Sequence, residues 1–231
     1  MGLKIKLLAL RCMKAPHSFI LANQQLWLTP LRAIYWENER ALIVSDLHFG
    51  KTGHFRKSGI GVPQDVYKHD LQRLFSLVQY FNPDELIIVG DFFHSGYNKE
   101  NEWFARWRHD HAHLKCTLIM GNHDILHQRW YGEQDINVIY DVYRKGPFGF
   151  THEWSENLLN DTETYFFTGH LHPGVRMAGA GKQTLRLPCF YFGKQMAILP
   201  AFSTFTGLAL VTPEKSANVF VIADQQLIHI R

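Results

Sequence analysis

Five short clusters of acidic, amide and imidazole side chains, each following an apolar run, stand out in the sequence. In chain order they contain Asp46, His48, Asp91, Asn122, His123, Asp124, His152, His170 and His172. Carboxylates and imidazoles are the side chains that bind hard or borderline divalent cations and that move protons near neutral pH. No cysteine lies among the clusters. The set therefore predicts metal-dependent or acid-base chemistry without a thiol.

Three of the clusters follow short, continuous apolar runs at 41–44, 86–89 and 117–120, which are typical of strands buried on both faces. Because side chains of a strand alternate between its faces, we expect Asp46 and His48 to point the same way. The same spacing of two relates His170 to His172. The carboxyl ends of parallel strands form the ligand-binding edge of an open α/β sheet, so the clusters should meet there.

Helical spacing of apolar residues separates these strands. Between the first two runs such residues recur from Val66 to Phe81, and a second helix is predicted after Asn98 as N-cap, with Trp103 and Trp107 on one face. From about residue 137 the chain is rich in strand patterns, including 165–167, 189–192 and 218–222. These patterns predict a β-α-β-α-β unit followed by a second, more antiparallel sheet.

Composition limits the class of protein. The chain has 231 residues, 46% hydrophobic and 19% charged, which resembles globular averages and excludes bulk disorder. No repeat, low-complexity tract or linker divides the chain, so we predict a single domain over residues 1–231. A net charge of +3 is too small to predict a generally basic surface, so any polyanion site must be local.

The apolar runs and the cysteines of the sequence indicate where in the cell the protein is expected. The longest uninterrupted apolar run, 219–223, is far too short to span a bilayer. Arg11 ends the apolar stretch near the start of the sequence, so we expect no secretion signal. The three cysteines are far apart and form no CxxC pair, which favours reduced thiols and a cytoplasmic location.

Taken in order, the clusters read Asp-x-His, Gly-Asp, Gly-Asn-His-Asp, a lone His and Gly-His-x-His. This order resembles the calcineurin-like metallophosphoesterase superfamily over residues 41–172. The resemblance implies an α/β fold of four layers, in which two mixed β-sheets pack face to face and are flanked by helices. It also implies a site for two divalent metal ions at the strand ends.

The resemblance further implies a role for each residue of the clusters. One metal would be held by Asp46, His48 and His172, the other by Asn122, His152 and His170, and Asp91 would bridge them. His123 would be a catalytic residue that faces the phosphate, with Asp124 behind it. Many members have glycine beside the lone histidine, whereas Thr151 and Glu153 flank His152 here. Oxygen and imidazole donors without thiolate suit manganese or iron, and zinc is also compatible.

Narrower stretches resemble the ligase-associated DNA damage response endonuclease branch of that superfamily. They are Ser-Asp-Leu-His-Phe-Gly-Lys at 45–51, Gly-Asp-Phe-Phe-His-Ser at 90–95 and Leu-Pro-Ala-Phe at 199–202, with Thr206 and Gly207 following. The branch implies a manganese-dependent phosphodiesterase that acts on DNA, with single-stranded DNA as the expected substrate. It also implies a DNA-repair system and association with a DNA ligase and a helicase.

The residues support a mechanism without a protein nucleophile. Two divalent cations outweigh the charges of Asp46 and Asp91, so the site attracts a phosphate diester, which a metal-activated hydroxide would attack. His123 is the group expected to protonate the leaving oxygen or to stabilise its charge. Lys51 and Arg56 begin a basic loop that could bind substrate phosphates, although such a run is more often ordinary solvated surface.

Two other functions are compatible with the sequence. A hydrolase of the same fold could act on nucleotides, phosphoproteins or lipid-linked pyrophosphate, and a deep closed pocket would favour it. A non-catalytic scaffold would suit a chain that lacks the Gly-Asn-His histidine, but His123 is present. We assign no role to His54, His94 and His127 from the sequence.

Overall fold

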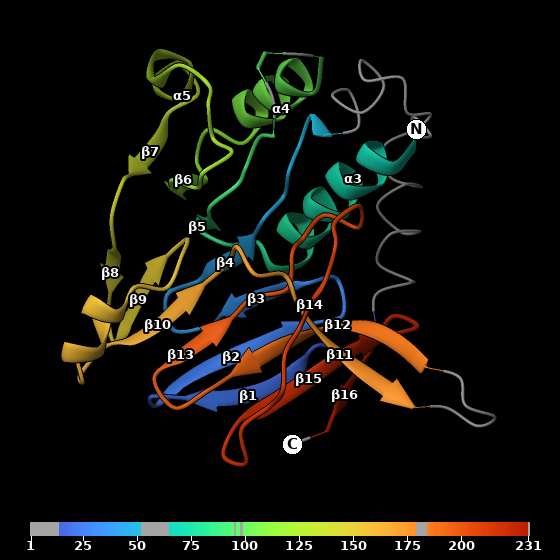
Figure 1. Ribbon diagram of the computed structural model, residues 1–231. Coiled ribbons are helices and arrows are strands. Elements are labelled where there is room, and N and C mark those ends of the chain that lie inside the picture. The colour runs from blue at the N-terminus through green and yellow to red at the C-terminus, as the bar shows by residue number, and fades with distance from the viewer. Residues whose placement is uncertain (1–13, 52–64, 95, 98, 179–183, 231) are drawn as a thin grey trace.

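The computed structural model describes residues 14–51, 65–94, 96–97, 99–178 and 184–230 (Figure 1). A first, seven-stranded sheet has the order β1-β2-β3-β4-β5-β6-β7. Its strands are β1 (His17–Leu21), β2 (Gln24–Thr29), β3 (Ala33–Trp36), β4 (Ala41–Ser45), β5 (Glu85–Val89), β6 (Lys115–Ile119) and β7 (Ile136–Ile139). Strands β1 to β4 pair antiparallel and β4 to β7 pair parallel. The sheet is therefore mixed, and β4, β5 and β6 all end at one edge.

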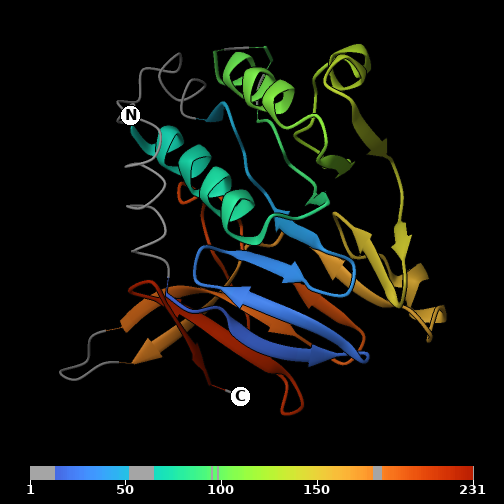
Figure 2. The same cartoon turned by 180° about the vertical axis from the view of Figure 1, so that it is seen from behind.

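Helices connect the parallel strands and cover one face of this sheet (Figures 1 and 2). They are α3 (Asp65–Phe81), α4 (Lys99–Asp110) and α5 (Gln128–Glu133). Their apolar side chains, such as Leu74 and Phe104, pack with Val44 and Ile88 of the sheet in one buried cluster. Apolar residues at helical spacing on α3 and at alternate positions on the strands produce this layer.

The second sheet has nine strands, with the order β14-β11-β12-β13-β10-β9-β8 and with β15 paired to β12 and β16. They are β8 (Tyr143–Lys145), β9 (Phe148–Thr151), β10 (Tyr165–Thr168), β11 (Pro173–Ala178), β12 (Thr184–Phe192), β13 (Met196–Ile198), β14 (Ala209–Leu210), β15 (Asn218–Ala223) and β16 (Gln226–His229). A short 3-10 helix, η1 (Glu156–Asn160), precedes β10. Both parallel and antiparallel pairs occur, and the antiparallel ones predominate, as the sequence predicts.

The two sheets pack face to face through a core rich in aromatic side chains. Trp36, Ile43 and Ile87 of the first sheet share a buried cluster with Phe167 and Phe192 of the second. Each such side chain contributes about 1.5–3 kcal/mol when it is fully buried. This core joins the strand ends of the first sheet to the loops of the second sheet, where the remaining clusters of the sequence lie.

The predicted elements agree with this architecture. The three apolar runs are β4, β5 and β6, and the two predicted helices are α3 and α4. Asn98, the predicted N-cap of the second helix, lies outside the described residues. The two mixed sheets packed face to face are confirmed.

The helical layer of the described structure lies on the seven-stranded sheet. On the outer face of the nine-stranded sheet, Val175 and Val219 pack with Ala217 and Val211 of the segment before β15, and no α-helix of the described residues joins that cluster. No helix that the structure describes is long and apolar enough to cross a membrane.

Candidate metal centre

The predicted site residues lie in tight turns just beyond the strands. Strand β4 ends at Ser45, and Asp46 and His48 both have left-handed backbones, with φ of 51° and 50°. Asp91, His170 and His172 are also left-handed, with φ of 48°, 64° and 49°. Asp46 and His48 do meet as expected, with ligand atoms within 4.8 Å, but strand alternation is not the reason, because neither residue is in the strand. Left-handed residues other than glycine are strained, and such strain gathers at functional sites.

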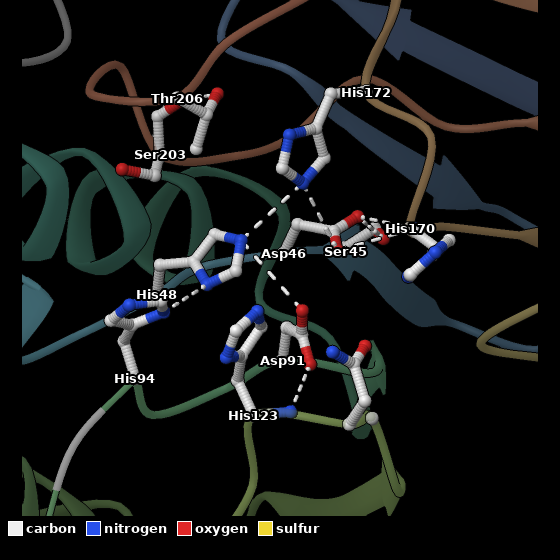
Figure 3. Close-up of polar contacts among 12 residues, drawn as sticks. Ser45, Asp46, His48, Asp91, His94, His123, His170, His172, Ser203 and Thr206 are labelled. Carbon is white, nitrogen blue, oxygen red and sulfur yellow. Dashed lines mark hydrogen bonds and ion pairs between the residues drawn. The ribbon is translucent and has the colours of Figure 1, made fainter. Parts of the chain in front are cut away.

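The first group of side chains consists of Asp46, His48 and His172. Nε2 of His172 lies 3.3 Å from Nε2 of His48 and 3.4 Å from Oδ1 of Asp46 (Figure 3). The side chains of Asp46 and His48 are buried, and His172 is partly exposed. Residues 124 positions apart in the chain thus meet at one point, where they could hold one cation.

The second group consists of Asn122, His152 and His170, with His152 in contact with both of the others. Nε2 of His152 lies 3.0 Å from Oδ1 of Asn122, 3.3 Å from Nδ1 of His170 and 3.5 Å from Oδ1 of Asp91. His152 is buried although Thr151 and Glu153, rather than glycine, flank it. The side chains that the sequence predicts for a second cation therefore also converge.

Asp91 lies between the two groups. Its Oδ1 is 3.5 Å from Nε2 of His152, and its Oδ2 is 3.8 Å from Nε2 of His48. Gly90 and Gly121 allow this approach, because a Cβ on Gly90 would overlap the ring of His152 and one on Gly121 would overlap Asp91. Gly90 also has φ of 76°, which glycine adopts without strain.

The donor set fits divalent cations. Nitrogen and oxygen ligands lie roughly 2.0–2.2 Å from such an ion, so two ligands of one ion are at most about 4.4 Å apart. The separations from His172 to its group, from His152 to its group and from His152 to Asp91 run from 3.0 to 3.5 Å and meet this limit. Among the described residues no lysine or arginine forms an ion pair with Asp46 or Asp91. Two buried carboxylates that lie beside imidazoles and form no such ion pair match the needs of a cation site.

His48 is held in the neutral form that metal ligation requires. Burial, with smaller contributions from Lys51 and His172, lowers the pKa of His48 to about 2. Nδ1 of His152 lies 3.4 Å from the carbonyl oxygen of Val89, a contact that leaves its Nε2 available as a ligand atom. The hydroxyl of Ser45 donates to Oδ2 of Asp46 and so orients that carboxylate.

His123 lies beside these groups without belonging to them. Its backbone N–H donates to Oδ1 of Asp91 at 2.9 Å, and its ring centroid lies 5.5 Å from that of His48. The carboxylate of Asp124 does not reach the His123 ring. It accepts the backbone N–H groups of Phe92, Phe93 and Gly121 at 2.8, 3.0 and 3.0 Å. Burial raises the pKa of Asp124 to about 7, against the effect of these hydrogen bonds.

A family model confirms the superfamily that the order of the clusters indicates. The model for the calcineurin-like phosphoesterases matches residues 39–198, which include both groups and Asp91. The chain belongs to the calcineurin-like phosphoesterase family. Divalent metal ions are therefore expected at the site, and the identity of the metal stays a prediction.

Solved structures of two other proteins are similar to this phosphoesterase. Nuclease MPE from Pseudomonas putida superposes with a TM-score of 0.77 at 30% identity, covering 93% of this chain and 100% of that chain. The phosphoesterase Yfce from E. coli superposes with a TM-score of 0.43 at 13% identity, covering 81% of this chain and 96% of that chain. A search of the curated proteins gave no match. Similarity to the Pseudomonas nuclease agrees with the resemblance to the endonuclease branch.

Of the two predicted substrate-binding residues of the phosphoesterase, Lys51 lies within the described part of the chain. Lys51 is half-buried, and burial lowers its pKa while the charges of Asp91 and Asp46 act in the opposite direction. Its ammonium group therefore lies within electrostatic reach of both carboxylates. Arg56, like His54, lies outside the described residues.

Sequence reasoning missed one side chain at the centre of this phosphoesterase. Nδ1 of His94 lies 3.3 Å from Nδ1 of His48, and the rings of His94 and His123 are 4.3 Å apart. A backbone bridge between Phe49 and Phe93 brings these segments together. The available signal was its position three residues after Asp91. His127, also unassigned, caps α5 instead, where its Nδ1 accepts the N–H of Arg129 at 3.2 Å.

Proposed function

We propose that this phosphoesterase is a DNA endonuclease of a repair system, which hydrolyses phosphodiesters at a two-metal centre. The observation that carries the proposal is the position of Asp91, whose two carboxylate oxygens face one histidine of each group, at 3.5 and 3.8 Å. A carboxylate placed between two sets of ligands is suited to bridging two ions.

The ligand assignment follows from the two groups. Asp46, His48 and His172 would hold one ion, and Asn122, His152 and His170 would hold the other. Divalent ions bound there would supply an activated water and neutralise charge on the phosphate. Manganese is the expected metal, with iron or zinc as alternatives, because all donors are oxygen or imidazole nitrogen.

His123 would act on the substrate rather than on a metal. Asp91 holds its backbone, and its ring lies beside that of His48 at the same centre. We assign it the donation of a proton to the leaving sugar oxygen, which is a poor leaving group as an alkoxide. Asp124 would act as a positioning residue, because its three backbone hydrogen bonds hold the turns that carry Asp91 and Asn122.

DNA is the proposed substrate because similarity to the Pseudomonas nuclease extends over 93% of the chain. The narrower sequence resemblance adds single strands as the preferred form, a DNA-repair role, and a DNA ligase and a helicase as partners. Lys51, close to the two carboxylates, is the described basic residue placed to contact a phosphate near the scissile one. Arg56 is proposed for the same role from its sequence position.

One assay tests the function. The protein reconstituted with Mn²⁺ is incubated with circular single-stranded DNA, duplex DNA, bis-nitrophenyl phosphate and nitrophenyl phosphate. We expect cleavage of the single-stranded circle and of the diester dye, because an endonuclease needs no strand end and a diesterase accepts a doubly esterified phosphate. Asp91→Asn is the matched control, since it keeps the shape of the side chain and removes its charge.

The other outcomes separate the alternatives. Turnover of the monoester alone would indicate a small-molecule phosphatase of the same fold. Mn²⁺ binding without turnover of any of the four substrates would indicate a scaffold. Cleavage of the same strand in linear form, assayed in parallel, without cleavage of the circle would replace the endonuclease by an exonuclease.

A further inference from the structure

The segment from Ala201 to Thr204 connects the second sheet to the end of strand β4. Just before it, the N–H of Leu199 donates to the carbonyl of Thr168, continuing the pairing of β13. The N–H groups of Phe202 and Ser203 then donate to the carbonyls of Ser45 and Asp46, at 2.7 and 3.1 Å. The segment therefore contacts the main chain of Asp46, a residue with a left-handed backbone whose carboxylate is a proposed metal ligand.

Three charged side chains hold the other edge of this segment. Nη1 of Arg32 donates to the carbonyls of Ala201 and Ser203, at 3.0 and 2.6 Å. The carboxylate of Asp70 accepts the N–H and the hydroxyl of Thr204, at 3.1 and 3.2 Å. The guanidinium of Arg73 donates to the carbonyl of Phe202.

These side chains form a triad, Arg32–Asp70–Arg73, built from the β2–β3 turn and helix α3. Asp70 and Arg73 are 2% and 8% exposed, and Arg73 lies 3.5 Å from Asp70. Burial lowers the pKa of Arg73 to about 10, with Asp70 opposing the change. Buried charges lose hydration that an apolar core would not lose, so a triad of this kind is poorly explained by stability alone.

All three side chains of the triad form hydrogen bonds with the same segment. The hydrogen bonds described above join each residue of the segment, from Ala201 to Thr204, to a member of the triad. Nε of Arg73 is buried and has no hydrogen-bond partner in the part of the chain that the structure describes. The hydrogen bonds of the triad therefore go to the segment, even though this leaves Nε of Arg73 without a partner among the described residues.

We propose that the Arg32–Asp70–Arg73 triad is a positioning group for the metal centre. It fixes Ala201–Thr204, whose N–H groups hold the carbonyls of Ser45 and Asp46, and so sets the direction in which the Asp46 carboxylate leaves the strand. Ser203 of this segment and Thr206 just beyond it lie in the upper part of the view in Figure 3, above His48 and His94. The inference rests on the proposed metal centre and extends it to residues that touch neither metal nor substrate.

Arg32→Met tests the triad, because methionine keeps an apolar stem and removes both hydrogen bonds to the segment. Mn²⁺ binding to the apo protein is titrated by electron paramagnetic resonance, at a temperature where circular dichroism shows full folding. We expect binding to weaken by about 10–100-fold, the usual effect of losing a group that orients a ligand. The signal of a coupled Mn²⁺ pair should weaken in parallel.

Two variants make the effect specific. Arg32→Lys keeps a cationic donor and should restore most of the affinity. Glu85→Gln disturbs another buried charge cluster, at the opposite end of β5, and should bind Mn²⁺ as the parent does even if it is less stable. If Arg32→Met does not fold, Thr204→Val decides the question, because it removes only the hydroxyl contact to Asp70 and should weaken binding in the same direction.

The possible results separate the two proposals. A folded Arg32→Met, or Thr204→Val in its place, that binds Mn²⁺ as tightly as the parent would overturn the positioning role. Equal weakening in Glu85→Gln would also overturn it, because the effect would then follow general stability. A parent that binds no Mn²⁺ would overturn the metal centre itself, and the positioning role with it.

Discussion

Two buried polar clusters lie at opposite ends of strand β5, and the chain completes only one of them. At the beginning of the strand, Glu85 is 3% exposed and accepts hydrogen bonds from Thr117, Tyr143 and Lys145 at 2.7, 3.1 and 2.8 Å. Lys115 adds an ion pair at 3.0 Å. Burial opposes the charge of Glu85, but these contacts outweigh it and hold its pKa below the ordinary value.

At the other end of β5, Asp91 and Asp46 are equally buried but face imidazoles. Their backbones are left-handed, whereas Glu85 lies in a regular strand. The comparison teaches that burial of a carboxylate is not itself a sign of function. A carboxylate with its cations supplied by the chain serves the fold, and one that faces neutral ligands in a strained turn is built for an external cation.

The largest expected effect comes from removing the charge between the two ligand groups. Asp91→Ala should lose bound metal and reduce DNA cleavage by about 10³-fold or more, because the metals provide the electrostatic stabilisation of the reaction. Metal content by mass spectrometry and cleavage rates give the two readouts. Near-normal metal content together with normal turnover in this variant would contradict the two-metal interpretation.

A smaller effect is expected at His123. It separates metal binding from the chemical step at this end of β5. His123→Ala should keep its metals and slow DNA cleavage by about 10²-fold, while hydrolysis of bis-nitrophenyl phosphate changes much less. A sugar alkoxide needs a proton to leave, and nitrophenolate does not. Equal losses on both substrates would replace proton donation by charge stabilisation, and no loss on either would remove His123 from the mechanism.

At the structural end, Glu85→Gln should lower the free energy of unfolding by about 1–3 kcal/mol at neutral pH and leave cleavage unchanged. Because folding lowers the pKa of Glu85, its contribution is complete above the ordinary glutamate pKa and is lost as the pH falls through the folded value. Urea unfolding of parent and variant should therefore converge at acidic pH. A stability difference that grows with acidity, or a loss of bound metal, would contradict the contrast between the two ends.

The smallest effect concerns Lys51, the basic side chain near both carboxylates. Lys51→Ala should reduce the salt dependence of single-stranded DNA binding by about 0.7 in the logarithmic slope, the value for one phosphate contact on a single strand. Affinity measured across salt concentrations for parent and variant tests this. Parallel lines would assign Lys51 to the solvated surface.

Much of the parallel-strand unit could be predicted because its signals are local. The continuous apolar runs gave β4, β5 and β6, and helical spacing gave α3 and α4. Strands β1 to β3 were not predicted, because their residues alternate only partly and their pairing depends on contacts with β4 and with the second sheet. The predicted ligand residues were found by type and order, which does not require knowledge of their orientation.

The orientation of the same residues could not be predicted from local patterns. Strand alternation was expected to aim Asp46 and His48, but both lie in left-handed turns that are held by distant segments. His94 carries only its nearness to Asp91 as a local signal, and the Arg32–Asp70–Arg73 triad carries none, since their partners at His48 and Ala201–Thr204 are far away in the chain. Long-range contacts of this kind exist only once the sheets have packed.

The sequence by itself determined the order of β4, α3, β5, α4 and β6, the chemical types of the clusters and the resemblance to the family. The order of these elements follows from hydrophobic periodicity, the chemistry of the clusters from which atoms can donate electron pairs, and the family from the resemblance of the ordered motifs. Only the tertiary structure decided that site residues such as Asp46 and Asp91 lie in left-handed turns, that His94 joins them and that Glu85 is structural. The physical reason is that distances between side chains, and the strain that a backbone can sustain, depend on packing between segments that are tens of residues apart in the chain.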